Sequence, residues 1–172
     1  MGGADKGLLL HAGRPLVEHA IERLRPQVAG LLISANRNLD TYRAYGFPVV
    51  TDPGEERCGP LAGIQAGLQA CRTDWLVTCP CDCPDLPRDL VARLLAAATQ
   101  AAAPLAVAAT AEGLQPGFQL LRRDLLPVLT SYLAAGNRRA GAWCRDHGAV
   151  DTLFPDGAAF RNLNSPENLS QA

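Results

Sequence analysis

The amino-acid sequence predicts an α/β fold with three layers, in which helices cover both faces of a mostly parallel, mixed sheet. Short apolar runs alternate with helix-length segments through about residue 109, which is the pattern of βαβ units. Apolar residues make up 48% of the chain and charged residues 19%, as in an ordinary globular domain. Neither a linker nor an internal repeat divides the 172 residues, so we expect a single domain over residues 1–172.

The first two thirds of the chain carry the alternation. An apolar run at 8–10 is closed by a turn, and Pro15 suits the first turn of a helix because its fixed φ is already helical. The expected strands cover residues 30–34, 48–51, 75–79 and 105–109. The expected helices cover residues 15–25, 39–45, 59–71 and 87–98.

After Gly113 the order of elements changes. The sequence predicts a strand at 117–121, followed by helices over 123–134 and around 138–147. A short strand near 149–153 and a terminal helix after Ser165 complete the prediction.

Charge and cysteine content exclude several classes of protein. A net charge near −1 leaves no general basic surface, so we expect no nucleic-acid partner. The most apolar stretch, 94–111, is interrupted by Gln100 and Pro104, so we expect no membrane span. The N-terminus lacks the features of an export signal, and the six cysteines are therefore expected to be reduced thiols in a cytoplasmic protein.

The only lysine of the sequence, Lys6, lies in the glycine-rich segment Met-Gly-Gly-Ala-Asp-Lys-Gly, whereas all other basic residues are arginine. Glycines leave backbone N–H groups open to an anion, and a compact ammonium beside them is typical of a phosphate site. Gly2, Gly3 and Lys6 are therefore candidate phosphate-binding residues. The alternative is an exposed lysine on a frayed terminus.

Polar side chains follow three of the expected strands: Ser34 and Asn36, then Asp52, then Asp82. In open α/β sheets, ligands bind beyond the carboxyl ends of the strands. Asp82 lies between two prolines directly after a buried strand, and a carboxylate so placed suits Mg²⁺, which takes few protein oxygens and completes its shell with water and phosphate. The alternative is that Asp82 or Asp85 caps the following helix.

Two weaker signals accompany these carboxylates. Cys79, Cys81 and Cys83 alternate, which raises a zinc hypothesis, but zinc spacings normally leave two to four residues between paired cysteines, and small buried side chains are the commoner use. Gly59 precedes a helix whose free N–H groups suit a phosphate or a base. Arg138, together with the arginine that follows it, is either a further anion contact or a solvated helix end.

The segments MGGADKGLL, ISANRN, VVTD, GPLAGI and CPCDCPDLP, in this order and spacing, resemble the molybdenum cofactor guanylyltransferases. The segments QPGFQLL, YLAAGNRR and FRNLNSPENL extend the resemblance almost to the C-terminus. It implies a Rossmann-like nucleotidyltransferase fold and transfer of GMP from GTP to molybdenum-molybdopterin, with release of pyrophosphate. GPLAGI and CPCD favour the guanylyltransferases over the related cytidylyltransferases of the same cofactor.

The resemblance also implies roles for single residues. Lys6 and Asp82 would be catalytic: Lys6 would contact the GTP phosphates, and Asp82 would hold Mg²⁺. Asp52, Ser34 and Gly59 would complete the GTP site, although the family often has Asn where Ser34 stands. The implied molybdopterin residues are Arg138, Asn162 and Asn164. Molybdoenzymes or their chaperones are the implied recipients of the product.

The family begins with a buried strand, a Leu-Ala-Gly-Gly loop and an arginine, which precede the Met-Gly-Gly segment with which this sequence starts. Such a strand and loop supply ladder bonds and anion-binding N–H groups, so we expect the 172-residue chain to be poorly soluble or inactive. Two other functions remain open: a magnesium-dependent nucleotidyltransferase that uses CTP or a sugar-phosphate acceptor, and a non-catalytic molybdopterin-binding protein.

Overall fold

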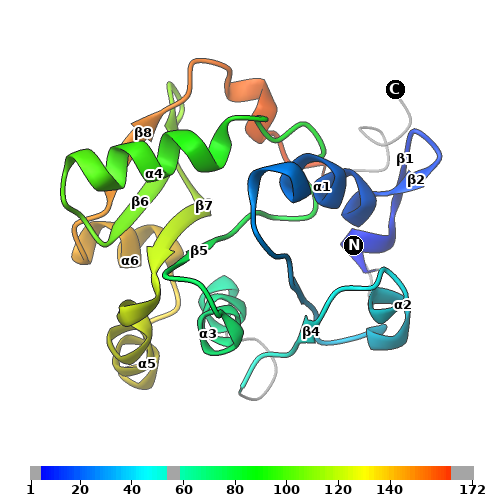
Figure 1. Cartoon of the computed structure of the whole chain (residues 1–172), viewed down its shortest axis with the longest axis horizontal. Coiled ribbons are helices and arrows are strands. Elements are labelled where there is room, and N and C mark those ends of the chain that lie inside the picture. The colour runs from blue at the N-terminus through cyan, green and yellow to red at the C-terminus, as the bar shows by residue number, and fades with distance from the viewer. Residues whose placement is uncertain (1–4, 54–58, 164–172) are drawn as a thin grey trace.

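The structure is a computed structural model, and it describes residues 5–53 and 59–163 (Figure 1). Gly2, Gly3, Asn164 and the helix expected after Ser165 lie outside these ranges. Within them, no helix is both long enough and apolar enough to cross a membrane.

The chain enters the described region through a short 3₁₀ helix and a tight hairpin. Asp5 caps the 3₁₀ helix η1 (Lys6–Leu8), because its side chain accepts a hydrogen bond from Gly7 N. The apolar run at 8–10 therefore begins in η1, and only its last residue enters β1 (Leu10–His11), which pairs with β2 (Arg14–Pro15). Ala12 and Gly13 between them both have positive φ, as a two-residue hairpin turn requires.

A small parallel sheet follows. Helix α1 (Leu16–Leu24) leads through η2 (Arg25–Gln27) to β3 (Ile33–Ser34), and helix α2 (Leu39–Arg43) connects β3 to β4 (Val49–Val50). The two strands are parallel, with Ile33 opposite Val49 and Ser34 opposite Val50. The predicted strands and helices of this region are confirmed, although the strands are shorter than expected.

The rest of the chain builds a four-stranded sheet in the order β5-β7-β6-β8. Its strands are β5 (Trp75–Val77), β6 (Leu105–Thr110), β7 (Gly113–Arg122) and β8 (Val150–Leu153). Its helices are α3 (Pro60–Ala70), α4 (Leu90–Gln100), α5 (Leu126–Ala134) and α6 (Ala140–Asp146), with the 3₁₀ helices η3 (Arg123–Leu125) and η4 (Gly157–Phe160).

The four-stranded sheet is mixed, as expected, but only β6 and β8 run parallel in it. Strand β7 is antiparallel to both β5 and β6. The cause is the very short connection between β6 and β7, since two residues can join only antiparallel neighbours. The sheet is therefore less parallel than the alternation of elements predicts.

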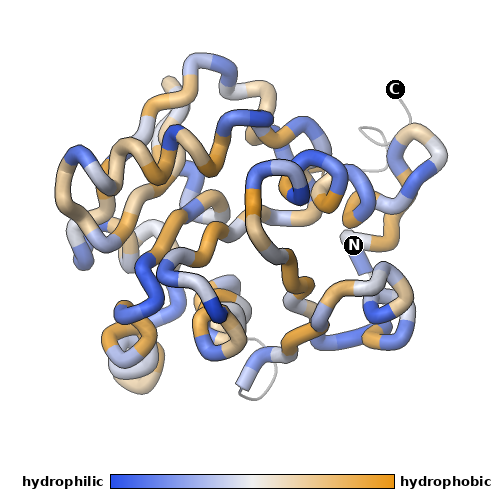
Figure 2. The backbone as a smooth tube through the Cα atoms, viewed as in Figure 1, coloured by the Kyte–Doolittle hydropathy of each residue, from blue (hydrophilic) through white to orange (hydrophobic). Residues whose placement is uncertain are grey.

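Helices cover both faces of this sheet, which gives the predicted three layers (Figure 1). Alternate residues of β6 face opposite sides: Ala106 and Ala108 pack in the core beneath α4, and Leu105 and Val107 pack in the core that includes Trp143 of α6. Figure 2 shows hydrophobic residues along the segment leading into β3 and along parts of β5 and α3, where the two sheets approach one another.

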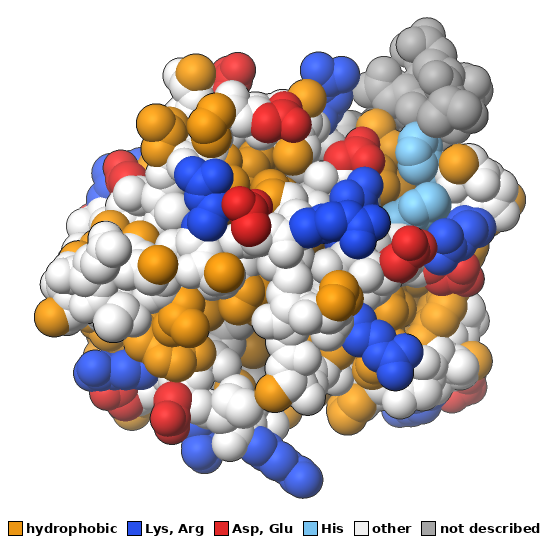
Figure 3. Space-filling view, turned by 45° about the horizontal axis from the view of Figure 1, so that its top comes forward, with side chains coloured by type: hydrophobic (Ala, Val, Ile, Leu, Met, Phe, Trp, Pro, Cys, Tyr) orange, Lys and Arg blue, Asp and Glu red, His pale blue; other side chains and the backbone are white. Residues whose placement is uncertain are grey.

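The surface in Figure 3 carries basic and acidic side chains side by side. Ion pairs join some of the surface charges: the Arg14 guanidinium lies 3.3 Å from Glu18 and 2.9 Å from Glu22. Arg23 lies 3.5 Å from Asp85. These arginines are thus compensated locally.

Candidate active site

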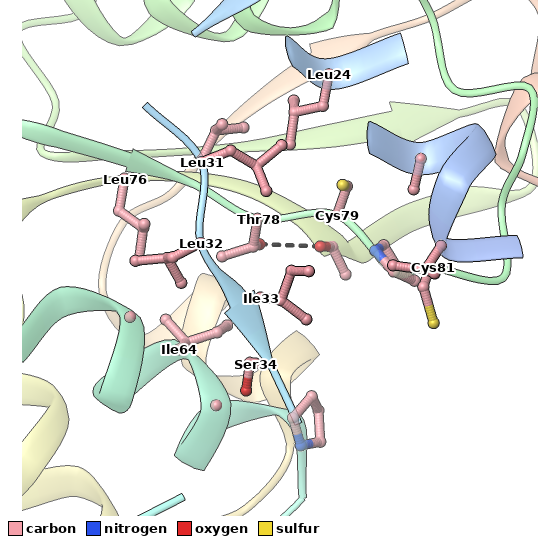
Figure 4. A pocket seen from close by; sticks show the side chains of 18 of the residues that line it. Leu24, Leu31, Leu32, Ile33, Ser34, Ile64, Leu76, Thr78, Cys79 and Cys81 are labelled. Carbon is pink, nitrogen blue, oxygen red and sulfur yellow. Dashed lines mark hydrogen bonds between the residues drawn. The ribbon is translucent and has the colours of Figure 1, made fainter. Parts of the chain in front are cut away.

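A cavity of about 460 Å³ separates the two sheets. Within the described ranges, β3 pairs only with β4 and β5 only with β7. No ladder of backbone hydrogen bonds between described residues therefore joins the two sheets. Leu32, Leu76 and Ile64 are among the apolar residues that line it (Figure 4). The polar groups lie where the strands end, and they include Ser34, Asp52 and Asp82.

Asp52 is held rigidly beside β3. Asn36 Nδ2 donates to Asp52 Oδ2 at 2.9 Å, and the backbone N–H of Asp52 donates to Asn36 Oδ1 at 2.9 Å. This reciprocal pair ties the loop after β3 to the loop after β4. Asp52 therefore presents a carboxylate whose orientation is fixed before any ligand arrives.

Gly63, in the first half of α3, faces the same polar end. A Cβ at this position would lie 2.8 Å from Ser34 Oγ and 3.6 Å from Asp52 Oδ1. Only glycine allows the helix to approach the strand ends so closely. The sequence segment GPLAGI contained Gly63, but nothing in its spacing indicated this contact.

The helix α3 begins at the cavity. Gly59 precedes it with φ of 72°, a conformation that favours glycine, and Pro60 occupies its first turn. A Cβ on Gly59 would lie 3.4 Å from the backbone oxygen of Arg138, so the segment before α6 closes over this helix end. The Arg138 guanidinium itself donates to the carbonyl oxygens of Leu133 and Asn137, at 2.6 and 2.7 Å. In this structure Arg138 thus caps the end of α5.

Lys6 pairs with Asp82, which lines the same cavity. Lys6 Nζ lies 3.5 Å from Asp82 Oδ2; half of the lysine side chain is exposed, whereas Asp82 is buried. Two contacts hold the Asp82 loop from behind: Leu163 N donates to the Asp82 carbonyl at 2.9 Å, and Cys83 Sγ donates to Asn162 Oδ1 at 2.7 Å. Asn162 therefore supports the loop that carries Asp82.

Neither carboxylate of this loop caps the next helix. Asp89 occupies the N-cap position of α4, and the Asp85 carboxylate pairs with Arg23. The capping alternative for Asp82 and Asp85 is therefore wrong, because α4 begins later than the sequence predicted.

The three alternating cysteines surround Asp82 but remain thiols. Burial raises the pKa of Cys79 to about 12, and burial together with the nearby Asp82 charge raises that of Cys81 to about 11. Burial likewise raises the pKa of Cys83. The residues that the structure describes contain no group of three His, Cys, Asp or Glu side chains able to hold a metal ion.

The structure thus brings together most of the predicted site. Ser34, Asp52, Gly59 and Asp82 line one cavity, and Lys6 joins it through its ion pair with Asp82. The side chains of Arg138 and Asn162 instead make the protein contacts described above. Sequence reasoning missed Gly63 and also missed the partners of Asp5, although Asp5 directly precedes Lys6.

Comparisons with known proteins agree on the family. Residues 1–150 match the model of the MobA-like NTP transferase domain. A molybdenum cofactor guanylyltransferase from Ralstonia nicotianae is 46% identical over 180 residues, covering 99% of this chain and 88% of the relative. One from Cupriavidus taiwanensis is 46% identical over 174 residues, covering 98% of this chain and 87% of the relative.

Solved structures confirm the fold. Molybdopterin-guanine dinucleotide biosynthesis protein A from Archaeoglobus fulgidus superposes with a TM-score of 0.74 at 17% identity, covering 97% of this chain and 88% of the other. The 2-C-methyl-D-erythritol 4-phosphate cytidylyltransferase from Thermus thermophilus gives a TM-score of 0.71 at 18% identity, covering 95% and 90%. The predicted α/β nucleotidyltransferase fold is therefore correct. The domain model matches most of the chain, and the relatives are 46% identical to it over almost its whole length. This protein therefore belongs to the molybdenum cofactor guanylyltransferase family.

Proposed function

We propose that this protein transfers GMP from GTP to molybdenum-molybdopterin, forming the guanine dinucleotide cofactor and pyrophosphate. The observation that carries the proposal is one cavity lined by two carboxylates: Asp82, which pairs with Lys6, and Asp52, which Asn36 holds in place. A nucleoside triphosphate suits both, because its anionic phosphates match Lys6 and its hydrogen-bond donors match Asp52. The family assignment supports the same reading.

In the proposed reaction, a phosphate oxygen of molybdopterin attacks the α-phosphorus of GTP. One phosphorus–oxygen bond forms while the bond to the β-phosphate breaks, and pyrophosphate leaves with that bonding pair. The protein has little covalent chemistry to perform, so its contribution is to position two anions and offset their charge. Lys6 does so as a point charge at the phosphates.

Asp82 fits a magnesium ion. Its carboxylate is a hard oxygen ligand beside Lys6, and Mg²⁺ commonly takes one or two carboxylates and fills its remaining positions with phosphate and water. A site with a single protein carboxylate is therefore sufficient. When bound, Mg²⁺ would neutralise charge on the phosphates.

Asp52 and Ser34 form the proposed guanosine end. Asp52 Oδ2 is occupied by Asn36, and Asp52 Oδ1 faces the space kept open by Gly63. No donor among residues 5–53 and 59–163 is recorded on Asp52 Oδ1, so this oxygen suits an N–H or O–H donor of the nucleoside. Gly59, at the start of α3, adds backbone N–H groups toward an anionic ligand.

We propose that Arg138, Asn162 and Asn164 belong to the molybdopterin side, as the resemblance implies. Arg138 would have to release the carbonyl oxygens of α5, and Asn162 would act chiefly by supporting the Asp82 loop. We further propose a single cytoplasmic domain over residues 1–172, which hands its product to molybdoenzymes or their chaperones.

The test is release of pyrophosphate by the purified chain with Mg²⁺ and molybdenum-molybdopterin, comparing GTP with CTP. In whichever preparation is active, the chain alone or the chain extended at its N-terminus, we expect turnover with GTP and little with CTP. A preference for CTP, or turnover with a sugar phosphate in place of molybdopterin, would establish the alternative transferase. Binding of molybdopterin without binding of GTP would establish the carrier instead. A second preparation, preceded by an apolar strand and a Leu-Ala-Gly-Gly loop, tests the expected gain in activity.

A further inference from the structure

Asp5, the residue before the proposed phosphate-binding lysine, is held by an unusually complete set of donors. Tyr42 Oη donates to Asp5 Oδ1 at 2.6 Å, and Asn38 Nδ2 donates to Asp5 Oδ2 at 3.0 Å. The backbone N–H of Gly7 adds a third bond, to Oδ1 at 3.3 Å. Both carboxylate oxygens are thus engaged, and Asp5 in turn caps the 3₁₀ helix that contains Lys6.

The donors come from a segment far from Lys6 in the sequence. Tyr42 lies in α2, and Asn38 is the N-cap residue of the same helix. Asn38 has φ of +50°, a left-handed conformation that few residues other than glycine adopt but that asparagine tolerates. Its amide satisfies Asp5 rather than the start of its own helix. Asn38 thus adopts an unfavourable backbone conformation at the position where its side chain reaches Asp5.

Tyr42 is buried against the Lys6 segment, close to Cys81 of the loop that carries Asp82. Only 4% of Tyr42 is exposed, and its burial and its bond to Asp5 both raise its pKa, so the hydroxyl remains a donor at neutral pH. A Cβ built on Gly7 would collide with the Tyr42 hydroxyl and would lie 3.3 Å from Cys81 Sγ. The tyrosine hydroxyl thus meets the Lys6 segment where that segment approaches the Asp82 loop.

We propose that Tyr42 and Asn38 are positioning residues, which fix the Lys6 ammonium opposite Asp82 by locking the Asp5 carboxylate. The proposal rests on the proposed function for its kinetic consequence, but not for its structural content. Without the Tyr42 hydroxyl, the longer bond to Gly7 N is the one that the described residues leave on Asp5 Oδ1, and Asn38 alone then ties the turn carrying Lys6 to α2. A displacement of about 1 Å at a phosphate-binding cation can lower the rate by about a hundredfold.

Two variants and one control test this. Tyr42→Phe removes the hydroxyl and keeps the ring, and Asn38→Gly removes the amide and keeps the left-handed backbone accessible. Tyr45→Phe is the control, since it removes a nearby hydroxyl that interacts with Glu18. The first readout is the NMR signal of Lys6 after reductive methylation with ¹³C-formaldehyde, in the nucleotide-free chain. It is specific because the sequence has no other lysine and the α-amino group gives a separate signal.

We expect the Lys6 signal to shift or broaden in Tyr42→Phe and Asn38→Gly, and to stay unchanged in Tyr45→Phe. An unchanged Lys6 signal in both test variants would overturn the proposal, whatever reaction the protein catalyses. The second readout is kcat and KM for GTP. We expect kcat to fall about 10- to 100-fold with KM changed by less than about threefold. A purely structural role would lower the melting temperature, yet leave kcat of the folded fraction and the Lys6 signal as in the wild type.

The two readouts separate failure of this proposal from failure of the proposed function. A shifted Lys6 signal, in a chain that releases no pyrophosphate from GTP even as wild type, supports the positioning role and contradicts the proposed reaction. Normal GTP turnover in Tyr42→Phe with an unshifted signal supports the reaction and contradicts the positioning role.

Discussion

A methyl group at position 63 would test the packing of α3 against the strand ends. In the interior of a helix, alanine is more favourable than glycine by about 0.5–1 kcal/mol. The new Cβ, however, would lie 2.8 Å from Ser34 Oγ, well inside normal contact distance, so Ser34 or the helix must move. Overpacking of this kind costs about 1–3 kcal/mol. We therefore expect Gly63→Ala to lower the free energy of unfolding by about 1 kcal/mol.

The same substitution should change sign when Ser34 is alanine. The new Cβ would then face the Cβ of residue 34 and Asp52 Oδ1, each at 3.6 Å, which is ordinary van der Waals contact. In a Ser34→Ala background, Gly63→Ala should stabilise the protein by about 0.5–1 kcal/mol, the gain in helix propensity alone. Nucleotide affinity should fall in both backgrounds, because the methyl group enters the space in front of Asp52.

Urea unfolding of the four proteins, followed by circular dichroism, gives the coupling between the two positions. Gly141→Ala in α6 is the matched control, since its Cβ would have its nearest contact at 3.7 Å. It should stabilise the protein in both backgrounds alike. If Gly63→Ala shifts the free energy of unfolding by the same amount with and without Ser34, the close approach described above is not present in solution.

Three further predictions concern the charged end of the site and the cysteines. Asp82→Asn should reduce transfer by at least about a hundredfold while the melting temperature changes little, because it removes charge at the phosphates and not packing; near-normal turnover at ordinary Mg²⁺ would exclude the metal role. Lys6→Ala should weaken GTP binding about tenfold or more in a titration, and Lys6→Arg should restore it only in part, since a planar fork does not replace a point charge. Stability should fall in alkali: the unfolded thiols of Cys79 and Cys81 ionise near pH 8.5, whereas in the folded protein their pKa values are about 12 and about 11. Their contribution is thus present below about pH 8.5 and is lost as the pH rises through about 11 and 12, so a urea midpoint that stays constant from pH 7 to about 10.5 would contradict this.

Local patterns predicted the strand ends well. Ser34, Asp52 and Asp82 each follow a short apolar run, and the rule that ligands bind at the carboxyl ends of strands was enough to group them. The bonds that hold them were beyond such reasoning. Asp5 and Tyr42 are separated by 37 positions, and no periodicity indicates that a buried hydroxyl will meet that carboxylate.

The errors have the same origin. The antiparallel strand β7 follows from a connection too short to cross the sheet, a feature of length rather than of composition. Asp85 resembled a helix cap because Pro87 looked like the first turn, but α4 begins only at Leu90, and Arg23 of α1 takes the carboxylate instead. A carboxylate such as that of Asp85 can cap a nearby helix or pair with a distant arginine, and the tertiary fold determines which of the two it does.

The division of strands β3 to β8 into two sheets has a consequence for how this protein responds to its ligand. The pair β3–β4 has two residues in each strand and rests on a small core around Val17, Ile33 and Tyr42, so it should open more readily than the four-stranded unit. Asp52 belongs to the weaker unit and Asp82 to the stronger. A nucleotide that contacts both would act as a brace between two folding units and would slow amide exchange in β3 and β4 more than in β6 and β7. Bound substrate would then make the two sheets unfold together, in addition to taking part in the reaction.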